Sequence, residues 1–189
     1  MSKNIKTCQW SSDDTLMIKY HDIEWGVPLH NDRKLFEFLV LDAFQAGLSW
    51  RTILHKRVNF KKAFDNFDPV KIAKFSQKDV NRLLKDAGII RNRLKIQATI
   101  TNAQAFLDIK KEYKSFDKYI WQFVDHKPIV NKFAKMSQIP AKTAISDKMS
   151  VDLKEKGFKF VGSTICYAFM QAAGMVNDHE TSCFRYKQV

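Results

Sequence analysis

Hydrophobic residues recur along this chain of 189 residues with the spacing of an α-helix. The densest stretch, from Arg33 to Ala46, has little polar face, which predicts a central, buried helix capped by Asn31 or Asp32. Two-residue alternation is confined to Phe158-Lys159-Phe160, so the pattern predicts an all-α fold. Further helices are expected from Asp13 or Asp14 to Gly26, Trp50 to Phe64, Ser76 to Asp86, Arg91 to Tyr113, Phe116 to Val124, Asp147 to Lys156 and Thr164 to Ala173, with Ser163 as a cap, Gly157 and Gly174 as terminators and a long connection from Asp125 to Thr143.

The central apolar helix carries a carboxylate, Asp42, close to its end. Burying an ionised carboxylate without partners is costly, so Asp42 must be paired with another group, hydrated at the wall of a pocket, or protonated. An acid in such surroundings indicates a ligand pocket, and that is our first hypothesis.

A tight, exposed corner is predicted directly after this helix. Gly47 suits a left-handed helix end, and Ser49 suits the cap of the next helix. Leu48 therefore has no obvious place to bury. It either packs locally or serves as a wedge that enters a stack of nucleic-acid bases.

A helical hairpin is predicted around Ala87-Gly88-Ile89-Ile90, between two helices. Backbone amides in a glycine-containing turn next to a helix start can bind a phosphate, and Arg91, Arg93 and Lys95 add positive charge around it. An ordinary hairpin of a helical bundle gives the same pattern.

The two ends of the chain hold residues that can bind a metal. Cys8 and His21 lie near one end and His179 and Cys183 near the other, and two thiols with two imidazoles suit tetrahedral zinc. The spacing between Cys8 and His21 is not that of a standard zinc finger, so two unrelated pairs remain an alternative. Four protein ligands would make the ion structural rather than catalytic.

Composition narrows the setting. Lys and Arg outnumber Asp and Glu by 32 to 20, a net charge of +12, which favours nucleic acid as a partner, although a solvated basic surface has the same composition. The longest apolar stretch, about 165–176, is too short to span a bilayer, and the amino terminus lacks the apolar core of a signal peptide. Three cysteines argue against a disulfide framework, with Cys166 expected in the core. We therefore expect a cytoplasmic protein without membrane contact.

Taken together, these residues resemble the bacterial DNA-3-methyladenine glycosylase I family of the helix-hairpin-helix superfamily. The resemblance spans nearly the whole chain. It is carried by Cys8-Gln9-Trp10, Tyr20-His21-Asp22-Ile23-Glu24-Trp25-Gly26-Val27-Pro28, Gln45-Ala46-Gly47-Leu48-Ser49-Trp50, Ala87-Gly88-Ile89-Ile90-Arg91, Gly157-Phe158-Lys159-Phe160-Val161-Gly162 and Asn177-Asp178-His179.

The resemblance implies a monomeric enzyme that flips 3-methyladenine out of double-stranded DNA and hydrolyses its glycosidic bond, releasing the free base without cutting the strand. The order of the predicted helices leads us to expect a middle lobe of about 33–115, with the helical hairpin, and a terminal lobe of about 1–30 plus 116–189. The residues with implied roles are Cys8, His21, His179 and Cys183 as ligands of one structural zinc ion, Gly47, Leu48, Ala87, Gly88, Ile89, Arg91 and Arg93 as DNA contacts, and Trp10, Met17, Tyr20, Trp50 and Asp42 around the base.

Asp42 is the implied catalytic residue, because it would accept hydrogen bonds from the base nitrogens; we do not assign it as the base that activates water. Two positions depart from the family pattern. Members typically have Glu where this chain has Asp42, and an aromatic residue where it has Met17. These departures keep open a non-catalytic reader of alkylated or distorted DNA. A helical small-molecule binding protein with an incidental basic surface is a third hypothesis.

Overall fold

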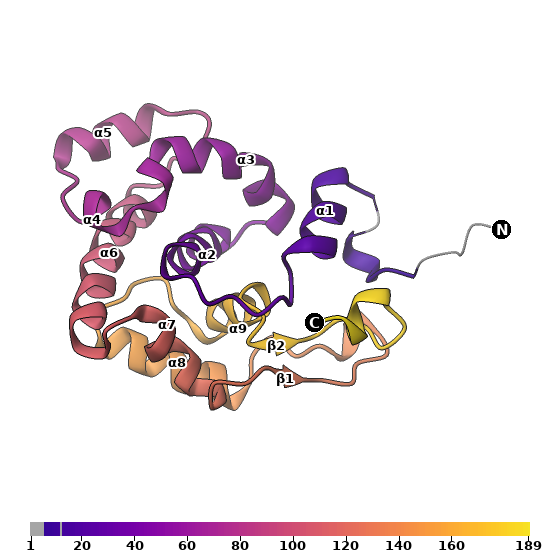
Figure 1. The fold of residues 1–189 in the computed structure, drawn as a ribbon. Coiled ribbons are helices and arrows are strands. Elements are labelled where there is room, and N and C mark those ends of the chain that lie inside the picture. The colour runs from indigo at the N-terminus through magenta and orange to yellow at the C-terminus, as the bar shows by residue number, and fades with distance from the viewer. Residues whose placement is uncertain (1–5, 12) are drawn as a thin grey trace.

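The computed structural model describes residues 6–11 and 13–189, and helices make up most of this part of the chain (Figure 1). The prediction of an all-α fold is confirmed. The α-helices are α1 (Thr15–Ile23), α2 (Asp32–Gln45), α3 (Trp50–Ala63), α4 (Pro69–Ile72), α5 (Gln77–Lys85), α6 (Arg93–Tyr113), α7 (Phe116–Trp121), α8 (Ala144–Glu155) and α9 (Ser163–Ala172). The shorter elements are the 3-10 helices η1 (Gln9–Ser11), η2 (Asp65–Phe67), η3 (Gln122–Val124), η4 (Met136–Gln138) and η5 (Phe184–Lys187) and the strands β1 (Ile129–Val130) and β2 (Val176–Asn177).

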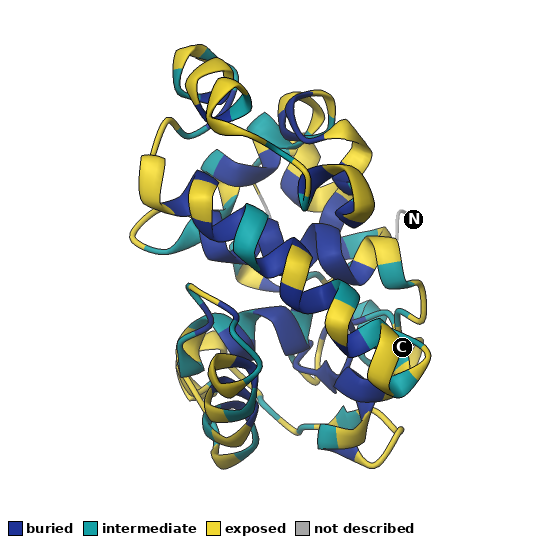
Figure 2. Cartoon of the chain, turned by 90° about the vertical axis from the view of Figure 1, so that its left-hand side faces the viewer, coloured by how far each residue is buried: buried dark blue, intermediate teal, exposed yellow. Residues whose placement is uncertain are grey.

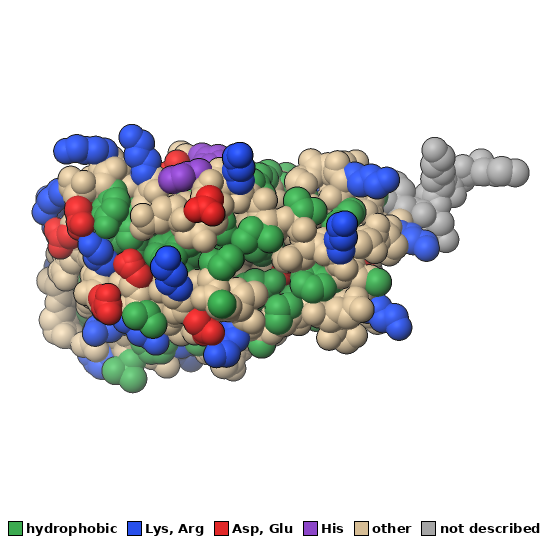
Figure 3. Space-filling view, turned by 90° about the horizontal axis from the view of Figure 1, so that it is seen from below, with side chains coloured by type: hydrophobic (Ala, Val, Ile, Leu, Met, Phe, Trp, Pro, Cys, Tyr) green, Lys and Arg blue, Asp and Glu red, His purple; other side chains and the backbone are tan. Residues whose placement is uncertain are grey.

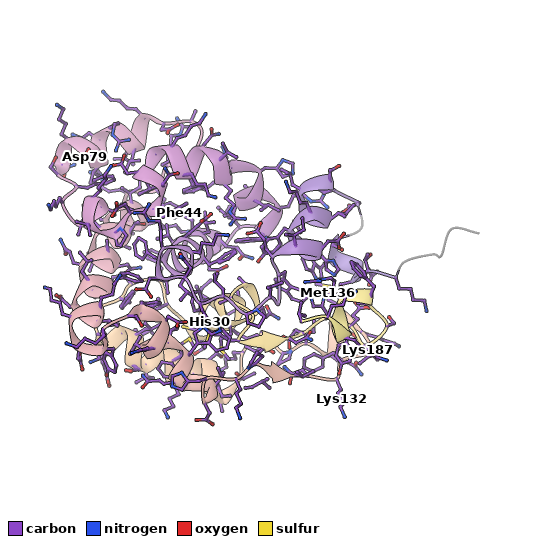
Figure 4. The ribbon with its side chains drawn as sticks, in the orientation of Figure 1. His30, Phe44, Asp79, Lys132, Met136 and Lys187 are labelled. Carbon is purple, nitrogen blue, oxygen red and sulfur yellow. The ribbon has the colours of Figure 1, made fainter. Side chains whose placement is uncertain are left out.

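Helix α2 forms the centre of the molecule, as the hydrophobic pattern predicts. It packs against α3, α6, α7 and α9, and every residue from Leu35 to Phe44 is buried (Figure 2). Phe44, close to its carboxyl end, lies in the middle of the molecule among the rings of Phe60 and Phe64 (Figure 4). Because α2 is enclosed on all sides, any polar group that it carries must find a partner inside the protein or a cavity.

Capping residues place most helix starts where the sequence predicts them. Asp14, Asn31 and Ser49 accept hydrogen bonds from backbone amides of the first helical turn, and Ser76 forms a capping box with Asp79. These starts are fixed by side chains within three residues of the helix, so they can be read locally.

Two helix starts were predicted wrongly. Helix α8 begins at Ala144 rather than Asp147, because Thr143 and Ser146 form a capping box. Helix α9 is capped by Gly162, and Ser163 is the first residue of the helix rather than its cap. The alternating stretch at 158–160 is not a strand, since Phe160 has a left-handed φ of 55° and the side chain of Asn102 bonds both backbone groups of Lys159.

The first described residues lie beside the C-terminal segment. Phe184 donates its amide to the carbonyl of Lys6 at 2.9 Å, and β1 pairs in parallel with β2 through Ile129 and Val176 (Figure 1). Only β1 lies within the connection from Asp125 to Thr143, while β2 follows α9, and no alternation in the sequence predicts this pairing. No helix among the described residues is long and apolar enough to cross a membrane.

Candidate functional site: a ring-lined cavity and a Cys/His cluster

A cavity of about 370 Å³ opens where α1, α2, α3 and α9 meet. Its aromatic wall comes from Trp10, Tyr20, Trp25 and Trp50. The rings of Tyr20 and Trp50 lie 5.0 Å apart at 45°, and those of Trp10 and Trp25 lie 5.0 Å apart at 75°. A wall of aromatic rings suits a flat, delocalised ligand.

Asp42 lines this cavity and is 2 % exposed. Its Oδ2 has no hydrogen-bond partner among the described residues, and the same holds for the buried indole Nε1 of Trp50. Burial raises the pKa of Asp42 well above its usual value, and the positive charge of Arg57 only partly opposes this. The carboxyl group therefore faces neither bulk solvent nor an ion pair, as the pocket hypothesis requires.

All five residues that the family resemblance places around the base line the cavity: Trp10, Met17, Tyr20, Trp50 and Asp42. Trp25, which the sequence singled out only as part of a family motif, is 7 % exposed and also lines the cavity. The remaining lining residues were not predicted from the sequence. They are Gln45 of α2, four residues of the β1–α8 connection (Met136, Ile139, Pro140 and Ala141) and four residues of α9 (Thr164, Tyr167, Ala168 and Gln171).

The β1–α8 connection forms one wall of the cavity. Met136 lies between α1 and the C-terminal segment and is 49 % exposed (Figure 4). Ile139 and Pro140 line the same wall. Nothing in the hydrophobic pattern distinguishes this wall from an ordinary surface loop, because the contact depends on the tertiary fold.

A partly buried ion-pair network holds the three helices that carry the polar and aromatic groups. Arg57 of α3 donates two hydrogen bonds of 2.8 Å to Glu24, which follows α1, and one of 2.7 Å to Glu37 of α2. Its guanidinium group also lies 5.1 Å from the ring centre of Phe38. Glu37 is a second acid on the apolar helix and was not among the residues predicted to be functional. It is 5 % exposed and is neutralised by Arg57 and Lys61.

The corner after α2 has the predicted geometry. Gly47 has a φ of +76°, and Leu48 is 42 % exposed. Lys95 holds this corner from behind, because its Nζ donates to the carbonyls of Phe44 and Ala46 at 2.8 and 2.6 Å. Lys95 was expected to add positive charge around the hairpin. That expectation is wrong, since the residue is 7 % exposed and its ammonium group is engaged inside the protein.

The hairpin between α5 and α6 is formed as predicted, but part of it is used internally. The amide of Gly88 donates to Asp86 at 2.7 Å, and the Ile89 side chain is buried. Lys56 donates to the carbonyl of Ala87 at 3.0 Å. Arg91 and Arg93 are exposed and remain the charged groups that can reach a partner.

Cys8, His21, His179 and Cys183 come together in the fold. All four are buried, and their ligand atoms lie within 4.8 Å of one another. Cys8 Sγ is 3.5 Å from His179 Nδ1, and Cys183 Sγ is 3.4 Å from His21 Nε2. Ligand atoms about 2.0–2.3 Å from a tetrahedral ion would be separated by roughly 3.3–3.8 Å, so the group can hold a metal ion.

The outer ring nitrogens of both histidines are already engaged. His21 Nδ1 lies 2.6 Å from a carboxylate oxygen of Asp22, and His179 Nε2 lies 3.1 Å from the carbonyl oxygen of Trp25. Both partners only accept, so these nitrogens carry the protons and the inner nitrogens, which face the cluster, are unprotonated. Burial lowers the pKa of His179 to about 4 and also lowers that of His21, which favours the neutral rings that metals bind.

Comparison with known proteins identifies the family. Residues 10–186 match the family model described as methyladenine glycosylase. The chain belongs to the methyladenine glycosylase family. It is 52% identical over 182 residues to DNA-3-methyladenine glycosylase 1 of Escherichia coli (strain K12), covering 96% of this chain and 97% of that protein. It is 46% identical to DNA-3-methyladenine glycosylase of Haemophilus influenzae (strain ATCC 51907 / DSM 11121 / KW20 / Rd), covering 93% of this chain and 95% of that protein.

Solved structures of this family share the fold. A crystal structure of 3-methyladenine DNA glycosylase I superimposes with a TM-score of 0.93 at 52% identity, covering 95% of this chain and 98% of that one. A structure of 3-methyladenine DNA glycosylase I from Staphylococcus aureus, described as showing the structural basis of 3-methyladenine recognition, superimposes with a TM-score of 0.92 at 35% identity. The match covers 96% of this chain and 97% of that one. The family resemblance and the glycosylase fold inferred from the sequence are therefore confirmed.

Proposed function

We propose that this protein is a DNA-3-methyladenine glycosylase that removes 3-methyladenine from alkylated double-stranded DNA by hydrolysing its glycosidic bond. The observation that carries the proposal is the ring-lined cavity with the buried, unpartnered carboxyl group of Asp42, in a member of the methyladenine glycosylase family. A flipped purine needs such an enclosed pocket with stacking faces and a few polar groups.

The cavity suits a positively charged base. Alkylation at N3 makes adenine cationic and a good leaving group, so the pocket has mainly to bind the extruded base and to stabilise the developing positive charge on the sugar. Tyr20 and Trp50 supply stacking and cation–π contact. Asp42 supplies a hydrogen-bonding carboxyl group whose negative charge is favoured once the cationic base is beside it.

We propose that the enzyme is monofunctional. Glycosylases that also cut the strand need an amine nucleophile that forms a Schiff base with the sugar. No lysine is among the described residues that line the cavity, and the buried Lys95 donates to two carbonyls of the adjacent corner. Hydrolysis by water is the route that these side chains support.

A base-release assay tests the proposed activity. The protein is incubated with duplex DNA treated with a methylating agent, and the released bases are separated by chromatography. We expect free 3-methyladenine and an intact strand with an abasic site. Binding of the alkylated duplex without release of any base would instead identify a non-catalytic reader. No salt-dependent affinity for duplex DNA would favour a small-molecule binding protein.

We propose that Leu48 enters the base stack at the lesion, with Gly47 shaping the corner. Leu48→Ala is expected to weaken binding to duplex DNA that contains an abasic-site analogue by about tenfold, because one buried aliphatic side chain contributes roughly 1.5–3 kcal/mol. Free 3-methyladenine should bind unchanged. The measurements are a fluorescence anisotropy titration and a thermal melt.

Val151→Ala is the matched control, since Val151 is 56 % exposed and lies on α8. It should leave DNA binding unchanged. If Leu48→Ala instead destabilises the protein by the 2–5 kcal/mol typical of a core truncation, at about unchanged DNA affinity, Leu48 packs locally and is not a wedge.

We propose that Ala87, Gly88 and Ile89 of the hairpin contact a DNA phosphate through the backbone, assisted by Arg91 and Arg93. Replacing either arginine with Ala should weaken binding to all sequences and lower the slope of log K against log salt by about 1. Lys148→Ala, on α8, is the control with the same change of charge. A slope that falls equally in the control would place the phosphate contacts elsewhere.

On the face seen from below, Lys and Arg are interspersed with Asp and Glu, so charge there does not mark a DNA-binding surface (Figure 3).

We further propose one structural zinc ion at Cys8, His21, His179 and Cys183, because two thiols and two imidazoles at these separations suit Zn²⁺ and leave no position for a substrate.

The middle lobe of about 33–115 and the terminal lobe of about 1–30 plus 116–189 remain our proposed division of the chain. We expect a monomer that works in the cytoplasm, where its DNA substrate is found.

A further inference from the structure

Asp178 is a fully buried carboxylate whose partners come from two elements beside the cavity. Tyr167 of α9 donates its hydroxyl to Asp178 Oδ2 at 2.7 Å, and Gln171 of the same helix donates its Nε2 to that oxygen at 2.8 Å. Asn131, directly after β1, donates to Oδ1 at 2.6 Å. Tyr167 and Gln171 both line the cavity, whereas Asp178 does not.

This arrangement fixes which polar atoms Tyr167 and Gln171 can offer to a ligand. A carboxylate only accepts hydrogen bonds, so the Gln171 amide must turn its NH₂ group toward Asp178 and keep Oε1 as its free acceptor. The Tyr167 proton is likewise directed at Asp178, which leaves the lone pairs of the phenol oxygen. Burial beside Asp178 raises the pKa of Tyr167, so this proton is retained.

The other polar groups of the cavity are not fixed in this way. The hydroxyls of Tyr20 and Thr164 can rotate to donate or to accept, and the Gln45 amide can turn over. The carboxyl group of Asp42 accepts when ionised and donates when protonated, and its raised pKa makes both forms accessible. Trp50 Nε1 can only donate. A pocket distinguishes a donor from an acceptor on its ligand only through groups that cannot reorient, because a rotatable group satisfies both.

We infer that Gln171, oriented by Asp178 and helped by Tyr167, forms an acceptor edge on α9 that recognises the exocyclic amine at C6 of the bound purine. The inference rests on the proposed function. An amine at C6 donates to this edge, while an oxygen at C6, as in guanine or hypoxanthine, faces it with a second acceptor. The edge thus selects N3-alkylated adenine over N3-alkylated 6-oxopurines. Asp178 is a positioning residue in this scheme.

The test compares two free bases, 3-methyladenine and 3-methylhypoxanthine, which carries an oxygen in place of the amine at C6. Their dissociation constants are measured by tryptophan fluorescence, since three tryptophans line the cavity. The wild-type protein should prefer 3-methyladenine by about tenfold or more, the effect of leaving one buried polar group unpaired. Gln171→Met keeps the side-chain length and removes the acceptor, and it should abolish most of this preference.

Asp178→Asn should reduce the preference as well, because the asparagine can accept or donate and lets the Gln171 amide reverse. Its metal content and melting temperature are measured in parallel, since His179 is the next residue. Thr164→Val is the control on the same helix. It removes a rotatable hydroxyl from the cavity wall and should change the affinity for both bases by the same factor.

An unchanged preference in Gln171→Met, or an equal loss of preference in Thr164→Val, overturns the inference. The release assay on methylated DNA separates this failure from that of the proposed function. If wild-type protein releases 3-methyladenine while the preference is independent of Gln171, only the acceptor edge is wrong. If it neither binds nor releases 3-methyladenine, both proposals fall.

Discussion

Asp42→Asn is expected to lower the rate of 3-methyladenine release by about 10²–10³-fold, the usual effect of removing one group that stabilises charge in an enclosed site. Asparagine has nearly the same shape, so the cavity stays intact. It cannot become negatively charged when a cationic base and a positively charged sugar form beside it. The loss should appear in single-turnover release from methylated duplex DNA.

The matched control is Asp108→Asn, on the exposed surface of α6, where the side chain is 72 % exposed. It should release base at the wild-type rate. Release by Asp42→Asn within threefold of wild type would remove the carboxylate from the chemistry. Unchanged binding of free 3-methyladenine by the variant would in addition place Asp42 outside the base contacts.

The same substitution, which should lower activity, is expected to raise the stability of the folded protein at neutral pH. The pKa of Asp42 is raised in the folded protein above the ordinary value of 3.8, so between these two values the folded state holds more protons than the unfolded state. The free energy of unfolding therefore falls as the pH rises through this window. Asn lacks this titration. Melting temperatures at pH 4 and pH 8 should show Asp42→Asn gaining stability relative to wild type at the higher pH.

Local chemistry explains which parts of the structure could be predicted from the sequence. Caps such as Asp14 and Ser49, and the left-handed Gly47, act within a few residues, so the helix ends and the exposed corner were predictable. Ala144 was missed as a helix start because the capping pair Thr143 and Ser146 was overlooked, not because tertiary contacts decide it.

The polar surroundings of the cavity could not be predicted in the same way. Arg57 bonds a residue 33 positions away, and Asn131 bonds Asp178 across 47 positions. A lone charged residue on a helix gives no indication of such a partner. Lys95 illustrates the reverse error, because a basic residue next to a hairpin suggests phosphate binding until the fold brings the carbonyls of Phe44 and Ala46 to it. The Cys/His group was identified by residue type, while its geometry required the fold.

Cys183→Ala is expected to release the proposed zinc ion and to lower the melting temperature by about 10 °C or more. A structural zinc ion contributes on the order of 10 kcal/mol to folding in small domains, and a loss of even half of this corresponds to roughly 10–20 °C in a protein of this size. Metal analysis should find one zinc per wild-type chain and none in the variant. Cys166→Ala is the control, because Cys166 is equally buried but lies outside the cluster.

Loss of the zinc ion should also change the cavity. Trp10 lies within three residues of Cys8, and the carbonyl of Trp25 lies 3.1 Å from His179 Nε2, so two of the rings that line the cavity are held in place by the metal-binding residues. Without the ion these rings should loosen, and the affinity for free 3-methyladenine should fall together with the melting temperature. Wild-type protein that contains no metal, or a Cys183→Ala variant that keeps its ion, would show that the four residues are only a buried cluster. A variant that loses the ion but binds the base normally would show that the metal site is not needed to hold the cavity in shape.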